Sequence, residues 1–361
     1  MPSILMTGYP GFLGSSLLPR VLSRRHDATA VCLVQSKFTD LAAEHRSALV
    51  TRDSSLAGRI HLVEGDITSP TLVHGGATLP GDIDEIYHLA AVYDLSVSAA
   101  LARSVNVDGT RHVLDFAKEC ASLNRMHYVS TCYVSGRHPG VFGEEDLHVG
   151  QSFNNHYEET KYRAEAEVQQ AMSDGLPTTI YRPAVVVGES TTGETQKYDG
   201  PYFFLRLIMR QRHVALVPVV GNTRRAHLNL VPRDFVTDAI AYLSGLAKSE
   251  NRVYQLADPD PPTVHEVADA FATAVGCRLI SVRLPRTVAR WSTRHVPGVY
   301  RLTGVPAEAI DYFAHPTTYD TSNTTADLEE SGIAVPRFVD YADTLVRFVE
   351  AHPEVGSKAM A

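Results

Sequence analysis

The chain has 361 residues, of which 44% are hydrophobic and 20% are charged. This ordinary globular composition excludes a disordered chain and predicts one large unit with a smaller one. The formal net charge of -8 argues against a protein that binds nucleic acid through its phosphates, because such proteins carry an excess of lysine and arginine.

The sequence also bears on disulfide bonds, metal sites and membrane segments. Its four cysteines form no CxxC pair and its histidines show no tight ligand spacing, so neither a disulfide framework nor a metal site is predicted. The first residues lack the basic start of a signal peptide, and no run of about 18 apolar residues is present. We therefore expect a cytoplasmic protein without a membrane span that acts on a small molecule. A homo-oligomer remains open.

In the first half of the chain, short β-rich runs alternate with segments of helical spacing. Strands are expected at 3–7, 28–34, 60–64, 85–88, 126–130 and 178–182, and helices at 12–25, 97–120 and 157–173. Strands that alternate with helices pair in parallel through right-handed crossovers. The sequence therefore predicts an α/β fold with a Rossmann-type, doubly wound parallel sheet.

The pattern changes after Gly188, where Gly, Thr, Pro and Tyr become frequent. Helices are expected over 202–212 and 338–351, and the segments 228–231, 235–247 and 253–256 are expected to return to the main sheet. We expect a dinucleotide-binding domain at 1–190, with returns at about 228–258, and a smaller, interleaved C-terminal substrate-binding lobe at 191–227 and 259–352. Residues 353–361 are expected to form a flexible tail.

A glycine-rich turn, Thr7-Gly8-Tyr9-Pro10-Gly11-Phe12-Leu13-Gly14, joins the first expected strand to the first expected helix. Glycines there allow the backbone to approach a pyrophosphate closely, and the helix N-terminus offers free N–H groups. A turn that merely joins strand to helix is the alternative, but three glycines are unfavourable at a helix start unless something approaches closely. We expect a dinucleotide to contact Gly8, Gly11, Phe12, Leu13 and Gly14.

The end of the second expected strand bears on the choice of cofactor. A site for NAD usually places Asp or Glu there, whereas a site for NADP offers cationic or neutral donors. Here the strand ends in Gln35-Ser36-Lys37, and Lys37 could meet a 2′-phosphate. The sequence favours NADPH with contacts from Gln35 and Lys37; NADH is the alternative, and Lys37 could equally be a solvated loop lysine.

A second candidate for cofactor binding, Gly65-Asp66-Ile67, follows the third expected strand. At that position the Asp66 side chain could reach the amino group of an adenine ring. It could equally cap the following turn, as aspartate often does. Both interpretations stay open.

Tyr157 and Lys161 are four residues apart in an expected helix, so they share one face. A phenol with a pKa of about 10 takes part poorly in proton transfer at neutral pH unless a nearby cation favours its phenolate, and Lys161 supplies that cation. Upstream, Tyr128-Val129-Ser130-Thr131 ends a strand in hydroxyl groups at the ligand edge of the sheet. Thr131 could then hydrogen-bond a reacting carbonyl oxygen. The alternative for the pair is an exposed amphipathic face.

Cys132 lies beside Thr131 and raises the possibility of a nucleophile that forms a thioester. No base partner is evident in the sequence, and a free cysteine is often a small buried hydrophobe. We therefore expect Cys132 to be a packing residue.

Together these motifs resemble the extended short-chain dehydrogenase/reductase family over most of the chain. Besides those already quoted, the resemblance rests on His88-Leu89-Ala90-Ala91, Asn106-Val107-Asp108-Gly109-Thr110 and Arg182-Pro183. It implies a catalytic triad of Thr131, Tyr157 and Lys161, with Lys161 also touching the nicotinamide ribose. The further cofactor contacts that it implies are Ile67, Leu89, Ala90, Pro183 and Val186.

Within that family, the segments 153–165 and 181–193, followed by Asp199-Gly200-Pro201-Tyr202, look like the fatty acyl-CoA reductase and thioester reductase branch. This narrower resemblance implies reduction of an acyl thioester, bound to coenzyme A or to an acyl carrier protein, to an aldehyde or alcohol. One alternative is an enzyme of the same family that acts on a ketone or alcohol, a sterol or a nucleotide sugar, as a reductase or an epimerase. Another is a non-catalytic NADP-binding sensor.

Overall fold

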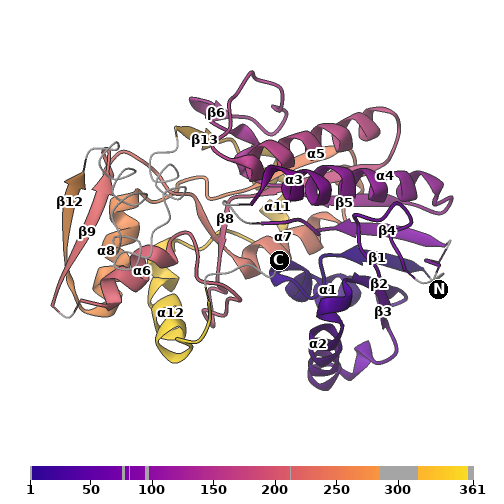
Figure 1. Ribbon diagram of the computed structural model, residues 1–361, viewed down its shortest axis with the longest axis horizontal. Helices are drawn as coiled ribbons and strands as arrows, with labels where there is room; N and C mark the ends of the chain where they lie inside the picture. The colour runs from indigo at the N-terminus through magenta and orange to yellow at the C-terminus, as the bar shows by residue number, and fades with distance from the viewer. Residues whose placement is uncertain are drawn as a thin grey trace.

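The computed structural model of the protein describes residues 2–74, 78–80, 82–93, 97–211, 213–284 and 316–356. Its centre is a seven-stranded parallel sheet in the order β11-β7-β5-β4-β1-β2-β3 (Figure 1). These strands are β1 (Ser3–Thr7), β2 (Thr29–Val34), β3 (Ile60–Glu64), β4 (Ile83–His88), β5 (Arg125–Val129), β7 (Thr178–Pro183) and β11 (Arg252–Leu256).

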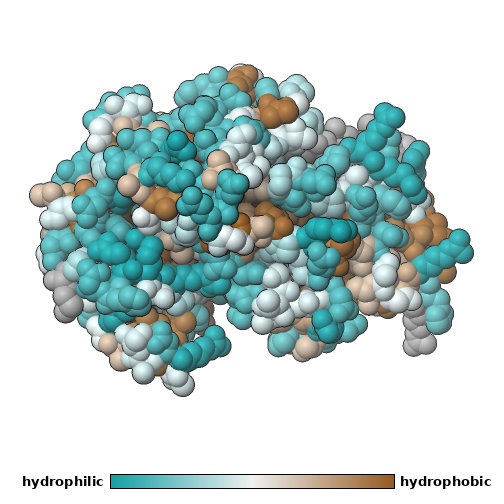
Figure 2. Space-filling view, turned by 180° about the vertical axis from the view of Figure 1, so that it is seen from behind, coloured by the Kyte–Doolittle hydropathy of each residue, from teal (hydrophilic) through white to brown (hydrophobic). Residues whose placement is uncertain are grey.

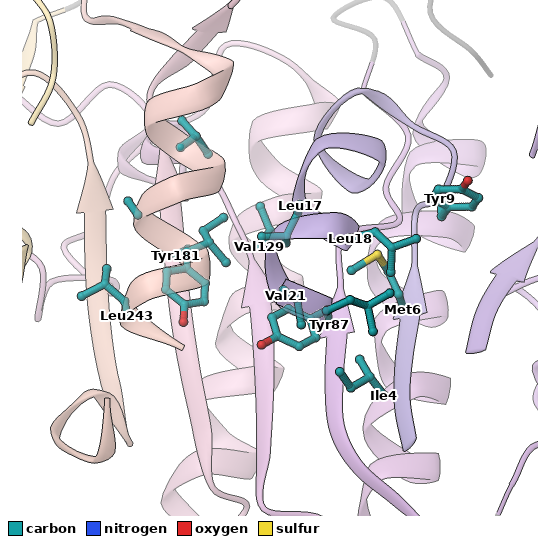
Figure 3. Packing of buried hydrophobic residues seen from close by; sticks show 14 of the residues in the cluster. Ile4, Met6, Tyr9, Leu17, Leu18, Val21, Tyr87, Val129, Tyr181 and Leu243 are labelled. Carbon is teal, nitrogen blue, oxygen red and sulfur yellow. The ribbon is translucent and has the colours of Figure 1, made fainter. Parts of the chain in front are cut away.

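Helices cover both faces of this sheet (Figure 1). One face carries α1 (Phe12–Arg24), α2 (Thr39–Arg52) and α7 (Arg233–Leu243), and the other carries α4 (Gly109–Glu119) and α5 (His156–Ser173). Leu17, Leu18 and Val21 of α1 pack over Ile4 and Met6 of β1 (Figure 3). Because both faces are covered, β1 and β4 are buried along their whole length, as is usual for parallel sheets.

The strand order places a ligand crevice. β1 pairs with β2 on one side and with β4 on the other, so the chain reverses its direction of winding at β1. In open α/β sheets, ligands bind outside the carboxyl ends of the strands at such a reversal. The turns after β1, β4 and β5 therefore converge on one edge of the sheet.

A second hydrophobic cluster is built from elements that lie beside the sheet, and Figure 1 shows the position of these elements. It joins α6 (Tyr202–Met209), β9 (Val214–Val220), α8 (Val264–Val275) and α12 (Phe338–Ala351), and β12 (Arg278–Leu284) pairs with β9. Shorter elements complete the description: α3 (Ala99–Ala102), α11 (Ser322–Leu328), and the strand pairs β6 (Gly140–Phe142) with β13 (Thr317–Tyr319) and β8 (Val185–Val187) with β10 (Leu230–Pro232).

The predicted α/β fold with a Rossmann-type parallel sheet is confirmed, and the six strands expected in the first half all lie in the sheet. One expected helix is divided. The segment 97–120 forms α3, a π-helical stretch at Arg103–Asp108, and α4. Asn106 in that stretch bonds the backbone of Val92 and the Thr160 hydroxyl. π-Helical turns inside α-helices are frequent at functional sites.

Several other differences concern the ends and the number of elements. The helix expected over 202–212 ends at Met209, and α2 and α8 were not predicted. For α8 a local signal was present, because Thr263 and Glu266 form a capping box at its start. α2 buries only Ala42 and Leu49, so it lacks the apolar stripe by which a helix is found. Residues 285–315 of the expected lobe and 357–361 of the expected tail lie outside the described residues.

The surface shows no continuous apolar band on the face drawn in Figure 2, where hydrophilic residues predominate and apolar ones form separate patches. Within the described part of the chain, no helix has both the length and the apolar character needed to cross a bilayer.

Candidate active site

A cleft of about 460 Å³ opens at the carboxyl ends of the central strands. It brings together every residue that the sequence singled out for cofactor binding or catalysis. These are Gly8, Gly11, Phe12, Leu13, Gly14, Gln35, Lys37, Asp66, Ile67, Leu89, Ala90, Thr131, Tyr157, Lys161, Pro183 and Val186. Residues from distant parts of the chain therefore share one site.

The glycine-rich turn packs tightly against the end of β4. Gly8 has φ +86°, and a Cβ there would lie 2.8 Å from the Ala90 nitrogen. A Cβ at Gly14 would lie 2.5 Å from the Gly8 oxygen. No side chain caps the start of α1 at Gly11, so its first N–H groups stay available to a phosphate. The cradle fits the pyrophosphate of a dinucleotide.

Replacing Gly8 with alanine is expected to weaken NADPH binding by at least about tenfold, or ~1.4 kcal/mol. The added Cβ would push the turn away from Ala90 and also meet an unfavourable positive φ. Fluorescence titration with NADPH measures the effect. Gly58→Ala is the matched control, because Gly58 has φ +74° but no atom within 4 Å of the added Cβ. Equal affinity in both variants and the parent chain would contradict the cradle.

The side chains expected at the adenosine end make contacts with each other. Asp66 Oδ1 accepts hydrogen bonds from the Thr68 amide and hydroxyl, so the turn-capping interpretation is realised. Its Oδ2 accepts from Gln35 Nε2 at 2.6 Å. Burial raises the pKa of Asp66, but the hydrogen bonds from Thr68 and Gln35 outweigh it and lower that pKa overall. Lys37 is exposed, with its Nζ 5.0 Å from the Phe38 ring centre.

Leu89 and Ala90 are fixed by a buried hydrogen-bond network below them. Thr7 Oγ1 lies 2.7 Å from His88 Nδ1 and accepts from the Ala90 amide at 3.1 Å. His88 Nε2 lies 3.0 Å from Thr110 Oγ1. Burial, assisted by the nearby Lys161, lowers the pKa of His88 to about 3, so the imidazole is neutral. The network joins the ends of β1 and β4 without adding charge.

Tyr157 is on the first turn of α5, where the Asn155 side chain caps the helix by accepting from the Glu158 amide. Burial raises the pKa of Tyr157, and a hydrogen bond with Thr131 acts in the opposite direction. Thr131 follows β5 directly and also contacts the Pro183 carbonyl. The phenol and the hydroxyl therefore meet in the cleft.

Lys161 lies one turn further along α5 and is almost fully buried. Its Nζ donates to the Tyr128 hydroxyl and to the Val129 carbonyl, each at 2.9 Å. Burial lowers the pKa of Lys161 to about 7, although the Glu165 carboxylate acts to raise it. An ammonium group has three N–H donors, so a third remains for a ligand in the cleft.

A fully buried ion pair supports this site from behind. Arg182 of β7 donates to Glu165 of α5 at 2.6 and 2.9 Å, and both side chains are 0% exposed. Glu165 also accepts from the Ser130 hydroxyl at 2.5 Å. The pair ties α5 to the strand ends that carry Thr131 and Pro183. Cys132 is buried and donates to the Arg182 carbonyl, and burial raises its thiol pKa, which disfavours a nucleophile.

The polar residues of the cleft that the sequence did not single out individually include Tyr93, Lys197 and Asp199. Lys197 Nζ lies 2.7 Å from Asp199 Oδ2 and 4.6 Å from the centre of the Tyr93 ring. The change of composition after Gly188 and the quoted segment from Asp199 to Tyr202 were the available signals. These signals indicated the segment, but they did not indicate which side chains enter the cleft.

Comparison with known proteins gives a consistent result. Residues 6–240 match the profile of a family described as "Male sterility protein". A linear gramicidin synthase of Brevibacillus parabrevis is 30% identical over 71% of this chain and 5% of its own length. Glycine betaine reductase ATRR of Emericella nidulans is 28% identical over 82% of this chain and 24% of its own length. The chain thus spans about a quarter or less of these curated relatives.

A solved structure is similar over nearly the full length of both chains. It is the terminal R domain from the myxalamid PKS-NRPS biosynthetic pathway, which is 28% identical to this chain, with a TM-score of 0.81. The match covers 98% of this chain and 91% of the other. The similarity therefore includes the second hydrophobic cluster as well as the central sheet.

Proposed function

This chain belongs to the extended short-chain dehydrogenase/reductase family, in the branch described as male sterility protein, and from that premise we propose that it reduces an acyl thioester to an aldehyde or alcohol. Membership makes it an NAD(P)-dependent oxidoreductase. One observation carries the proposal: Thr131, Tyr157 and Lys161 share a single cleft with the glycine-rich turn, in a fold that resembles a terminal R domain over nearly its whole length.

NADPH is the cofactor that we propose, with NADH as the alternative. It would supply a hydride to the carbonyl carbon of the substrate. Gly8, Gly11 and Gly14 would hold its pyrophosphate, and Asp66 its adenine end. The exposed ammonium of Lys37 suits a 2′-phosphate, and no carboxylate follows β2 at Gln35. Leu89, Ala90, Pro183 and Val186 would pack on its other parts.

The residues of the chain handle the proton and the developing negative charge. In this proposal Tyr157 donates its proton to the carbonyl oxygen as the carbonyl carbon is reduced. Thr131 donates a hydrogen bond to the same oxygen, and the Lys161 ammonium stabilises the phenolate that remains on Tyr157. The Tyr128 hydroxyl and the Val129 carbonyl keep that ammonium in place.

The acyl group would arrive on coenzyme A or on a carrier protein. This part of the proposal rests on the similarity to a gramicidin synthase, a reductase and a terminal R domain. The chain spans only a small part of these curated relatives. The activities of their remaining segments are therefore not assigned to this chain.

The direct test follows NADPH absorbance when the purified protein meets long-chain acyl-CoA, with NADH run in parallel. Oxidation that depends on the acyl-CoA and is faster with NADPH is the expected result. If neither cofactor is oxidised although NADPH binds tightly, carrier-bound thioesters, then ketones and alcohols, become the substrates to examine. Failure of all of these would leave a cofactor-binding sensor.

The pH dependence gives a separate prediction for Lys161. The ratio kcat/KM reports groups of the free enzyme. Because burial lowers the pKa of Lys161 to about 7, its ammonium is present below that pH and lost above it. We therefore expect kcat/KM for the cofactor to fall as the pH rises through about 7. Arginine stays charged at all these pH values. In the Lys161→Arg variant, kcat/KM should therefore not fall as the pH rises through about 7. A flat wild-type profile up to about pH 9 would contradict the assignment.

A further inference from the structure

A second tyrosine–lysine pair, Tyr93 and Lys197, lines the same cleft as Tyr157 and Lys161. The rings of Tyr93 and Tyr157 meet edge to face with their centres 5.4 Å apart. The Lys197 ammonium lies over the Tyr93 ring, 4.6 Å from its centre. Only one aromatic ring therefore separates the Lys197 cation from the proposed proton donor, and the proton transfer proposed above does not use it.

Asp199 holds the members of this cluster together. Its carboxylate pairs with Lys197 Nζ at 2.7 Å. Burial, together with the nearby Asp199 carboxylate, raises the pKa of the Tyr93 hydroxyl. The Lys197 and Asp199 side chains are only 18% and 23% exposed. A charge in such a partly buried place interacts more strongly with a nearby charge than one at the surface does.

The backbone that carries Lys197 is fixed at both of its ends. Gln196 Nε2 donates to the Pro10 carbonyl in the glycine-rich turn. The next residue, Tyr198, donates its hydroxyl to the His352 carbonyl and its amide to the Gly356 carbonyl. The segment therefore spans from the cofactor cradle to the end of α12, and Lys197 is presented to the cleft from a tethered position.

A thioester makes a demand that an aldehyde does not. Hydride addition to its carbonyl carbon must be followed by cleavage of the C–S bond, and the sulfur leaves with the electron pair. Tyr157 serves the oxygen, so a second group would assist the reaction where negative charge develops on sulfur. A preorganised cation in a partly desolvated site stabilises such a charge effectively.

We propose that Lys197 stabilises the departing thiolate during thioester reduction, with Asp199 and Tyr93 holding its ammonium in place. This rests on the proposed function. In the step, the carbonyl carbon gains a hydride from the reduced nicotinamide while Tyr157 protonates the oxygen. The oxygen then returns that proton to Tyr157 as the C–S bond breaks, and the sulfur takes a proton from the Lys197 ammonium, which regains one from solvent. The products are an aldehyde, a free thiol and the oxidised nicotinamide. Reduction of the aldehyde to an alcohol breaks no C–S bond and does not involve Lys197.

The test compares two reactions of the same protein: NADPH-dependent reduction of an acyl-CoA and of the matching free aldehyde. Lys197→Met is expected to lower the first by about 10²-fold and to leave the second within about threefold, whereas Lys197→Arg restores most of the loss. Lys118→Met is the matched control, because Lys118 is exposed on α4 and pairs only weakly with Asp115, at 3.8 Å.

A series of thioesters with thiols of increasing acidity gives a readout that a purely structural role would not change. A more acidic thiol leaves without help, so the loss in Lys197→Met should shrink along the series. If Lys197→Met slows both reactions equally, or neither, the role of Lys197 is wrong while thioester reduction stands. If the unaltered protein reduces the aldehyde but no thioester, the proposed function and this inference both fall.

Discussion

Replacing Tyr157 with phenylalanine is expected to lower turnover by about 10²- to 10⁴-fold, the usual contribution of a positioned proton donor. The change removes only the hydroxyl that hydrogen-bonds Thr131. The phenyl ring keeps its edge-to-face contact with Tyr93. We therefore expect the fold and the affinity for NADPH to stay within about threefold of the parent, or ~0.7 kcal/mol. Steady-state NADPH oxidation and a cofactor titration measure the two quantities.

The matched control for this change is on the same helix. Tyr162 of α5 also loses one hydroxyl in Tyr162→Phe, but that hydroxyl bonds His148 outside the cleft. Its turnover should stay near that of the parent chain. Near-normal turnover in Tyr157→Phe, with the cofactor bound normally, would rule out Tyr157 as the proton donor. A loss that follows impaired cofactor binding would instead point to a packing role.

Arg182→Met is expected to destabilise the protein by about 3–5 kcal/mol, because it leaves the Glu165 carboxylate buried without its partner. Arg182 also donates to the carbonyls of Gly143, Glu144 and Asp146, and these acceptors would lose their donor. Urea unfolding at neutral pH measures the change in the free energy of unfolding. We also expect lower activity, since Glu165 contacts Ser130 beside Thr131.

A double variant separates the buried charge from the shape of the side chain. Arg182→Met combined with Glu165→Gln removes both charges, and a neutral amide is far less costly to bury than an unpaired carboxylate. The double variant should therefore recover part of the stability that Arg182→Met loses. Exposed ion pairs contribute less than about 1 kcal/mol. If Arg182→Met lowered the free energy of unfolding by no more than that, the Arg182–Glu165 pair would not behave as a buried ion pair.

The sequence predicted the cofactor cradle because its chemistry is local. Gly8, Gly11 and Gly14 occupy positions where a Cβ would meet the backbone of the turn or of β4, so the requirement is visible in a few adjacent residues. The strands were predicted for a similar reason, since each is a short run rich in β-branched, aromatic and other apolar residues between turn signals. Tyr157 and Lys161 share a helix face, and their spacing alone indicated it.

Helix α2 and the division of the helix expected over 97–120 were not predicted, because neither depends on a local sequence pattern. α2 buries two side chains only, which leaves little periodicity to detect. The π-helical stretch contains Asn106, whose partners Val92 and Thr160 lie elsewhere in the chain. Such partners are known only once the chain has folded.

The sequence by itself therefore determined the fold class, the glycine-rich turn proposed to hold the cofactor and the shared helix face of Tyr157 and Lys161, because each follows from residues close together in the chain. The tertiary structure decided the cluster of Tyr93, Lys197 and Asp199 beside Tyr157, which unites segments about a hundred residues apart. It also decided that Glu165 and Arg182 form a buried pair behind Lys161. Distances between such residues depend on how strands and helices pack, and the spacing of residues in the sequence does not predict that packing.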